Sequence, residues 1–330
     1  MKTIQIERRP GLSKEEFNRE YLKGIGKPVI VPDGIQEWPA RTKWSFEYLK
    51  KTYGSDTVVV AAGLESRVMK MTKLAAYIDH LDKADQDLPG FWLDPATALP
   101  RAEPIEPAKS PLYLVGWHAF KQHPELFEDI QPGPRFVDDW VLTLNPLMRS
   151  VFEWTAERDY WDVLIGPAGS FSKLHVDYWE THSWLAQIQG SKRCILFSPE
   201  DSDFLYEGRV NPEQPDFDRF EKFARATLFE GVIEPGDVLF QPSGWWHMIR
   251  AREKSVSVSH GFFNQRNVNE HLGNLLRALP KLVSGLEGAP EERAALGIEW
   301  KSKGFQTDSA AGDLSNKIPK YWEIFSGSLT

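Results

Sequence analysis

The fold of this chain is decided by SKLHVD at residues 172–177, which is completed further along by GWWH at residues 244–247. Residues two apart on a β-strand point to the same face, so His175 and Asp177 can reach one metal ion together. The third ligand must come from another strand, and we expect it to be His247. Two histidines and one carboxylate leave positions open for a co-substrate and oxygen, and this ligand set suits non-haem Fe(II). These three residues are therefore the predicted catalytic metal ligands.

The short His-x-acid pattern also occurs at His80 and at His123, among eight histidines in all. His80 lies in an amphipathic pattern over residues 72–81 that is typical of a helix, where residues two apart face away from each other. His123 precedes a proline, which indicates the start of a helix. Both are better explained as surface or hydrogen-bonded core histidines. Only the motif at His175 follows a strand-like run and a glycine-rich turn.

The composition is that of a globular protein of 330 residues, 41% of them hydrophobic and 12% aromatic. The formal net charge of -8 argues against a nucleic-acid partner, although a local basic patch stays open as an alternative. Cys194 is the single cysteine, which excludes an internal disulfide and is typical of a buried core thiol.

The N-terminus is polar over residues 2–9, and no apolar region typical of a signal peptide follows it. No apolar stretch approaches the roughly 20 residues of a membrane span. We therefore expect a cytoplasmic protein without a membrane partner.

The first part of the chain predicts short helices and strands. Ser13 and Glu16 have the spacing of a capping box, and Ser45 predicts the start of a second helix that Gly54 closes. We predict strands at residues 28–31, 57–61 and 110–115 and a helix at residues 72–81. Residues 83–110 are rich in Pro, Asp and Ala and predict a long loop that would cover the site.

From residue 160 onward, short strands separated by Gly and Pro turns indicate a sandwich or barrel, here a jelly roll. The predicted strands span residues 161–166, 172–178, 184–189, 192–198, 228–234, 236–241, 246–251 and 254–263. An acidic insertion at residues 199–227 is expected to be irregular, with a short helix. The predicted class is mainly β with flanking helices.

After Asn264 the hydrophobic period becomes helical, and Pro280 is expected to kink or divide the helix. The apolar residues with this period form a stripe along the predicted helix, and such a stripe needs a partner surface. That surface is either the domain's own side or a second subunit. We divide the chain into a domain at residues 1–264 and a helical region at residues 265–330. In the first, core strands occupy about residues 110–264 and additions occupy residues 1–109.

Four linked motifs resemble the cupin-like JmjC oxygenases: HVD at 175–177, QIQGSKRCILF at 187–197, PGDVL at 235–239 and WWH at 245–247. The nearest sub-group contains the asparaginyl hydroxylase of hypoxia-inducible factor. The resemblance is strong across residues 160–264 and looser in the N-terminal half. It implies a double-stranded β-helix core with N-terminal α/β additions, and Fe(II), 2-oxoglutarate and O2 as cofactor and co-substrates. Family members use the C-terminal region to dimerise, so the resemblance favours a homodimer.

The resemblance also implies a site for the far carboxylate of 2-oxoglutarate. Lys192 matches the family's lysine, Ser172 a threonine and Tyr113 a tyrosine. Strand alternation cannot choose between Lys192 and Arg193. Ser172 as the end of a turn and Tyr113 as a core residue are the alternatives. On the last core strand, His260 takes the place of an asparagine near the co-substrate in the hydroxylase named above.

The segment after Asp177 departs from that hydroxylase because it is longer, and this puts the substrate in doubt. We expect Trp179, Glu180 and His182 to meet the substrate, with Trp184 and Trp245 as walls of the pocket. Glu180 and His182 would hold a cationic or polar group. The alternative is that the tryptophans cover the mouth of the barrel.

The resemblance implies hydroxylation of a C–H bond, coupled to conversion of 2-oxoglutarate into succinate and carbon dioxide. The substrate would be an amino-acid-type group on a protein, a peptide or a small molecule. A lysyl demethylase is the first alternative, ranked lower because no reader domain or zinc motif accompanies the core. A ligand-binding or zinc-dependent hydrolytic cupin is the second.

Overall fold

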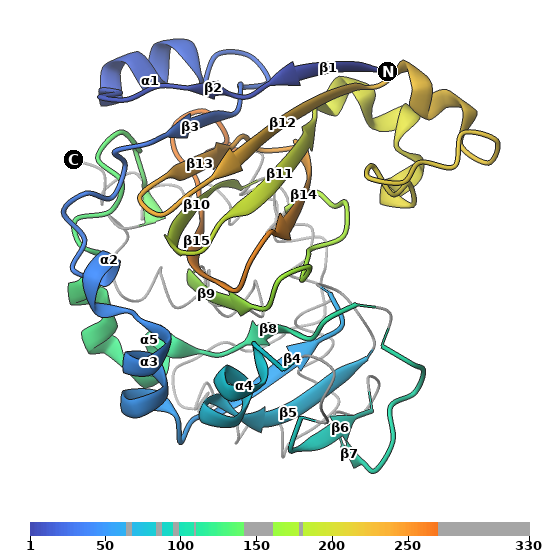
Figure 1. Cartoon of the computed structure of the whole chain (residues 1–330). Helices are drawn as coiled ribbons and strands as arrows, with labels where there is room; N and C mark the ends of the chain where they lie inside the picture. Colours follow the sequence, from blue (N-terminus) through green and yellow to red (C-terminus); the bar gives the residue numbers. More distant parts are fainter. Residues whose placement is uncertain are drawn as a thin grey trace, which may run out of the picture.

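Two facing β-sheets form the core of the structure, a computed structural model that describes residues 1–63, 68–83, 88–94, 99–108, 110–141, 161–177 and 181–269 (Figure 1). The four-stranded sheet has the order β1 (Lys2–Gln5), β12 (Thr227–Ile233), β11 (Lys192–Phe197) and β14 (Trp246–Ala251). The six-stranded sheet has the order β2 (Glu7–Arg8), β3 (Val29–Val31), β13 (Val238–Gln241), β10 (His182–Gln189), β15 (Ser255–Phe262) and β9 (Trp161–Gly166). Mainly antiparallel pairing within two packed sheets confirms the predicted jelly-roll core.

Alternate residues from both sheets fill the space between them. Leu185 on β10 meets Cys194 and Leu196 on β11 in one buried cluster. Because side chains alternate along a strand, Lys192 at the start of β11 shares this inward face, whereas Arg193 points outwards. The structure thus shows that Lys192, and not Arg193, faces the interior, which the sequence left open.

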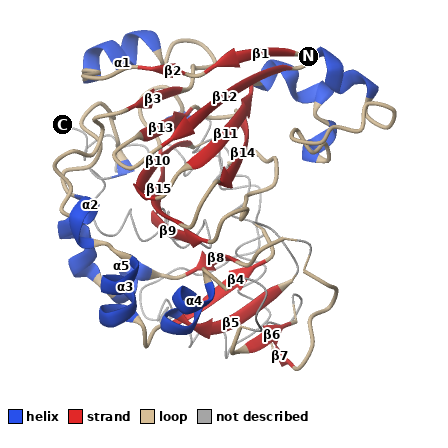
Figure 2. Cartoon of the chain, in the orientation of Figure 1, coloured by secondary structure: helices blue, strands red, loops and turns tan. Residues whose placement is uncertain are grey.

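The outer face of the six-stranded sheet packs against N-terminal helices, which Figure 2 shows along one flank. They are α1 (Lys14–Glu20) and α2 (Ala40–Lys43), and α3 (Phe46–Tyr53) follows α2 along the same flank, beside the third sheet. Phe17 of α1, for example, packs edge-on against Phe240 of β13 with ring centroids 4.7 Å apart. The predicted capping box at Ser13 and the N-cap at Ser45 are confirmed, since each side chain accepts a backbone N–H of the first turn.

Residues 199–226 cover the outer face of the four-stranded sheet, and we call them the insertion. It contains three 3-10 helices, η4 (Pro199–Phe204), η5 (Tyr206–Gly208) and η6 (Glu221–Arg225). Leu205 and Phe223 of the insertion pack on Phe197 of β11 and Met248 of β14. In place of the expected single short helix, the insertion has these three short 3-10 helices.

Residues 2–8 form an extended segment of two short strands, β1 and β2, that the sequence did not predict. β1 pairs in parallel with β12, and β2 pairs in parallel with β3 of the other sheet, so one extended segment joins both sheets. Ile6, between them, is buried in the inward cluster, and Arg8 donates to both carboxylate oxygens of Asp237 at 2.9 Å. An edge strand with exposed polar side chains has almost no hydrophobic pattern, which is why the sequence did not predict it.

A third sheet lies below the core in Figure 1, with the order β7 (Pro100–Arg101), β6 (Phe91–Leu93), β5 (Met69–Lys73), β4 (Thr57–Ala61) and β8 (Tyr113–Gly116). α4 (Leu74–His80) follows β5, and α5 (Ala119–Gln122) and η1 (Pro124–Ile130) follow β8. β6 and β7 correct the prediction that residues 83–110 form one long loop. The Tyr77 hydroxyl of α4 lies 2.9 Å from the carbonyls of Leu112 and Ile165, which ties this sheet to the core.

The expected C-terminal helices, their role in a homodimer and the domain boundary stay predictions, because residues 270–330 lie outside the described part of the chain. Within the described ranges, no helix has the length and apolar character needed to cross a membrane.

Candidate metal centre

His175, Asp177 and His247 come together in space. One donor atom from each lies within 4.8 Å of the others. Asp177 Oδ1 is 3.8 Å from His175 Nε2 and 3.6 Å from His247 Nε2. The His247 side chain is buried, while those of His175 and Asp177 are partly exposed. The structure therefore brings together the three residues that the sequence predicts as metal ligands.

The two histidines lie opposite each other across an antiparallel pair. His175 N–H donates to the His247 carbonyl at 3.1 Å, and His247 N–H donates back at 2.8 Å. Their ring centroids are 4.2 Å apart. Residues 171–175 thus run along β14, but as isolated bridges rather than as the continuous strand predicted at residues 172–178. β14 is the last strand of its sheet. Residues 171–175 pair with it on one side, and this pairing is interrupted between the two bridges.

Backbone carbonyls fix the orientation of both imidazoles. The Nδ1 atom of His175 lies 2.6 Å from the Lys173 carbonyl, and that of His247 lies 3.2 Å from the Trp245 carbonyl. A carbonyl can only accept, so each Nδ1 carries a proton, and in the neutral imidazole Nε2 is then the nitrogen that can bind a metal. Such outer hydrogen bonds are typical of metal-binding histidines.

The second oxygen of Asp177 is held by residues of the opposite sheet. Ser183 on β10 donates its hydroxyl to Asp177 Oδ2 at 2.6 Å, and Gln241 on β13 donates to Ser183 Oγ at 3.1 Å. Oδ1 of Asp177 faces the two imidazoles. Sequence reasoning missed both residues. Ser183 lies just before the strand predicted at residues 184–189, because β10 begins two residues earlier, and Gln241 is the last residue of the strand predicted at residues 236–241.

Two neutral imidazole nitrogens and one carboxylate oxygen, all oriented by outer hydrogen bonds, fit a divalent first-row metal. With only three protein donors, the set leaves coordination positions for other ligands, as in non-haem Fe(II) sites.

Lys192 is 2% exposed on the inward face, and its ammonium lies 3.3 Å from the Tyr113 hydroxyl of β8. Burial lowers the pKa of Lys192 to about 7, because desolvation disfavours the charged form. Burial raises the pKa of Tyr113, so its hydroxyl stays protonated. Among the described residues, no carboxylate forms an ion pair with Lys192. A carboxylate ligand would supply the missing negative charge.

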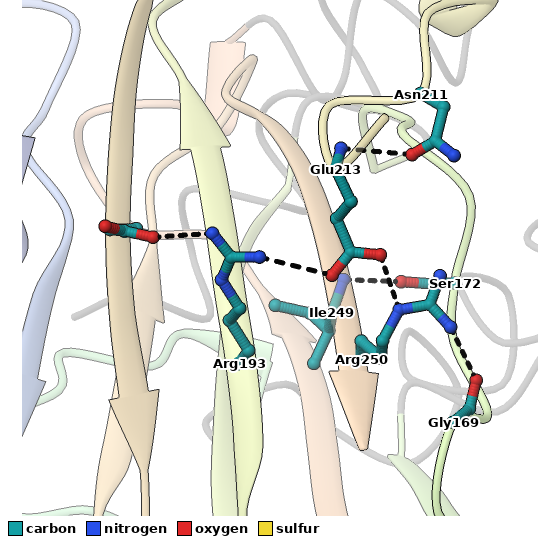
Figure 3. A network of polar contacts seen from close by, with 8 residues as sticks. Gly169, Ser172, Arg193, Asn211, Glu213, Ile249 and Arg250 are labelled. Carbon is teal, nitrogen blue, oxygen red and sulfur yellow. Dashed lines mark hydrogen bonds and ion pairs between the residues drawn. The ribbon is translucent and has the colours of Figure 1, made fainter. Parts of the chain in front are cut away.

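Ser172 lies beside β14, where its hydroxyl oxygen accepts the Ile249 N–H at 3.1 Å (Figure 3). Its O–H therefore stays available as a donor. Arg193, the alternative to Lys192, points to the outer face and pairs with Glu230 at 2.8 Å.

The structure places His260 away from the residues expected to bind the co-substrate. His260 is fully buried, pairs with Asp139 at 2.7 Å and stacks on Trp161 at 3.9 Å between ring centroids. Trp161 belongs to the cluster that packs on the outer face of the six-stranded sheet. Alternation on β15 turns its neighbour Ser259 inwards instead. The expectation for His260 is corrected, because the sequence motif did not fix which residue of the strand faces the interior.

His182 and Trp184 share that outward face, which also corrects their predicted contact with the substrate. Trp184 is 1% exposed and packs against Trp38 and Trp161. His182 lies between phenylalanine rings, and its Nδ1 accepts the Ser243 N–H at 2.9 Å in the turn before His247. Burial lowers the pKa of His182 to about 3.

Trp245 is placed differently from those two residues. It belongs to the inward cluster, and its indole N–H donates to the Ile25 carbonyl at 2.9 Å. Its ring contacts Phe229 edge-on. Trp179 and Glu180 lie outside the described residues.

Comparison with known proteins gives a consistent result. Residues 14–268 match the family described as Cupin-like domain. The chain is 28% identical to Arginine-specific demethylase JMJ20 of Arabidopsis thaliana (80% of this chain, 58% of that protein) and 32% identical to Lysine-specific demethylase 8 of Xenopus tropicalis (75% and 50%). It is 25% identical to 2-oxoglutarate and iron-dependent oxygenase JMJD4 of Gallus gallus (80% and 61%). The chain thus spans less than two thirds of these relatives. The special nearness to the asparaginyl hydroxylase stays a prediction.

Replacing Ser183 with Ala removes the hydrogen bond to Asp177. We expect metal affinity to fall about 10- to 100-fold, the usual effect of losing an outer partner of a metal ligand. Calorimetric titration of the metal-free protein with Mn(II) measures this. Ser257→Ala is the matched control, because Ser257 is an inward serine that bonds Gln187 instead. Equal affinities in the two variants would contradict the role of Ser183.

The low pKa of His182 predicts loss of stability in acid. Below the unfolded pKa of about 6.5, the unfolded chain binds a proton that folded His182 refuses, so stability falls with pH until about pH 3. His182→Asn keeps an acceptor for Ser243 but does not titrate. Between pH 6.5 and 5, the free energy of unfolding of the unmodified chain should fall about 1.5 kcal/mol more than that of the variant. Denaturant unfolding at both pH values measures this, and parallel changes would count against it.

Proposed function

Because this chain belongs to the Cupin-like domain family, we propose that it is an Fe(II)- and 2-oxoglutarate-dependent oxygenase. The proposed reaction hydroxylates a C–H bond of an amino-acid-type substrate and releases succinate and carbon dioxide. One observation carries the proposal: the His175, Asp177 and His247 cluster shares one interior with the buried Lys192, which has no carboxylate partner among the residues that the structure describes.

The spacing inside the core supports a dicarboxylate co-substrate. On paired strands β11 and β14, Leu196 lies opposite His247 and Lys192 lies opposite Ala251. Four residues along a strand cover roughly 13 Å. An extended lysine side chain and a five-carbon dicarboxylate can fill this span together. Lys192 would bind the far carboxylate, with Tyr113 and Ser172 as hydroxyl donors to it.

Each residue of the metal cluster has a defined task. The two Nε2 lone pairs and Asp177 Oδ1 would hold the iron, while Ser183 and the backbone carbonyls keep these donors aligned. When bound, iron supplies the activation of O2 and the oxidising power that no side chain has. The apolar side chains of the inward cluster, including Leu185 and Leu239, exclude water from the interior.

The names of the relatives support both the cofactors and the substrate class. JMJD4 is named for 2-oxoglutarate and iron, and two others are named as arginine- and lysine-specific demethylases. We therefore favour the side chain of a protein or peptide as substrate over a free small molecule. An N-methyl demethylase is the second candidate, because hydroxylation of an N-methyl carbon would lead to loss of the methyl group. A cytoplasmic homodimer stays part of the proposal.

The first test is turnover of 2-oxoglutarate. With Fe(II), ascorbate and oxygen, the protein should release succinate, and His175→Ala, Asp177→Ala and His247→Ala should each abolish this. Ser257→Ala is the control with unchanged metal donors. Mass spectrometry of peptides then separates the two candidates: hydroxylation adds one oxygen atom, whereas demethylation removes a methyl group as formaldehyde. If the protein is folded but releases no succinate, the proposal is contradicted and a non-oxygenase cupin is favoured instead.

The second test uses the pKa of Lys192. With a free pKa of about 7, this lysine must gain a proton to pair with a carboxylate above that pH. The dissociation constant for 2-oxoglutarate should therefore rise about tenfold per pH unit above pH 7. Calorimetry on the Mn(II)-loaded protein between pH 6.5 and 8.5 measures it. Lys192→Arg stays charged and should show a flatter dependence. The same pH dependence in both proteins would refute the role of Lys192.

A further inference from the structure

The segment that carries His175 lies at the margin of the core. Its backbone pairs with β14, through Ser172 and His175 and through bonds between Ala251 and residues 169–170. β14 is itself the last strand of its sheet. The separation of the two metal-binding histidines therefore depends on how firmly this segment is held against β14.

The insertion holds that segment from the outer side. Gly208 lies so close to Leu174 that an added Cβ would be 2.3 Å from the Leu174 carbonyl oxygen, and its positive φ of 74° also favours glycine. Leu174 is buried in the cluster that the insertion forms with the sheet. On β14, the Trp246 indole N–H donates to Ser202 of the insertion at 2.9 Å. The insertion thus contacts both histidine-bearing elements.

A polar network makes the second connection, and Figure 3 shows it from close by. Glu213 of the insertion accepts from Arg250 Nε at 2.5 Å and pairs with Arg193 at 3.4 Å. The other side of the Arg250 guanidinium donates to the Gly169 carbonyl at 2.7 Å and covers the Phe171 ring at 4.4 Å. Arg250 therefore joins the insertion to the start of the segment that leads to His175.

Glu213 is needed because two like charges face each other beneath it. Arg193 on β11 and Arg250 on β14 are direct cross-strand partners, and both point outwards. Like charges directly opposite on a sheet repel. The Glu213 carboxylate sits between the two guanidinium groups and binds both, and its side chain is only 16% exposed. Its own backbone N–H donates to Asn211, which fixes the turn that presents it.

We propose that Glu213 and Arg250 are positioning residues of the metal centre. Glu213 neutralises the arginine pair and orients Arg250, which holds residues 169–171 against β14 and thereby sets the separation of His175 and His247. This inference rests on the metal centre of the proposed function. Neither side chain touches the metal donors, so the effect passes through the backbone pairing.

The test compares two substitutions of the same chemistry in one network. Glu213→Gln removes the charge between the arginines, whereas Glu230→Gln removes the other carboxylate partner of Arg193 without touching Arg250. Full-length metal-free proteins are titrated with Co(II), well below their melting temperatures, by calorimetry and visible absorption. We expect Glu213→Gln and Arg250→Lys to bind Co(II) about tenfold more weakly with a shifted absorption spectrum. Glu230→Gln should match the unmodified chain.

A purely structural network would give a different pattern. If Glu213→Gln and Arg250→Lys bind Co(II) with unchanged affinity and spectrum, or if Glu230→Gln weakens binding as much, the positioning role is overturned. Such a result, with succinate release intact in the unmodified chain, would leave the proposed function standing. If the unmodified chain neither binds Co(II) nor releases succinate, the proposed function fails, and this inference fails with it.

Discussion

The reciprocal hydrogen bonds between the backbones of His175 and His247 are the constraint on which the rest of the site depends. They place two imidazoles opposite each other, 4.2 Å apart between ring centroids, although the residues are far apart in sequence. Asp177, two residues after His175, reaches the same point, with its Oδ1 3.8 Å from His175 Nε2 and 3.6 Å from His247 Nε2. Ser183 and Gln241 tie its carboxylate to the opposite sheet, so the cluster bridges the two halves of the core.

A buried lysine is the costliest feature of this interior. Burial shifts the pKa of Lys192 from 10.5 to about 7, which at neutral pH destabilises the folded chain by on the order of 4 kcal/mol. This loss of folding stability is full below pH 7, where the lysine is charged in both states, and disappears as the pH approaches the pKa of the unfolded chain. A bound carboxylate offsets this penalty by favouring the charged form. Stability and ligand binding are therefore linked through one side chain.

Both outer faces of the core are covered by elements that position the site indirectly. On one face, the cluster that includes the N-terminal helices buries Trp184, and His182 on the same face fixes the turn before His247 through Ser243. On the other, the insertion packs on β11 and β14 and reaches the segment before His175. The metal cluster thus lies between two layers. The insertion contacts both histidine-bearing elements, whereas the other face acts on the turn before His247 through His182.

The sequence by itself determined the features whose signal is local. The alternation of strands, the capping box at Ser13 and the spacing of His175 and Asp177 follow from chain geometry over a few residues. The third ligand, His247, could be named because its motif is distinctive. The strand at residues 2–8 could not, because its partners β12 and β3 are distant in sequence and its exposed residues carry no hydrophobic pattern.

Only the tertiary structure decided which face of each strand is the inside. A shift of one residue turns every side chain to the other face, so the sequence could not choose between Lys192 and Arg193, or place Ser259 rather than His260 inwards. It also assigned His182 and Trp184 to the substrate because they follow the metal motif, whereas both are buried on the outward face of their strand. The Arg193, Glu213 and Arg250 network joins three separate elements, and long-range contacts of this kind leave no trace in any one stretch of sequence.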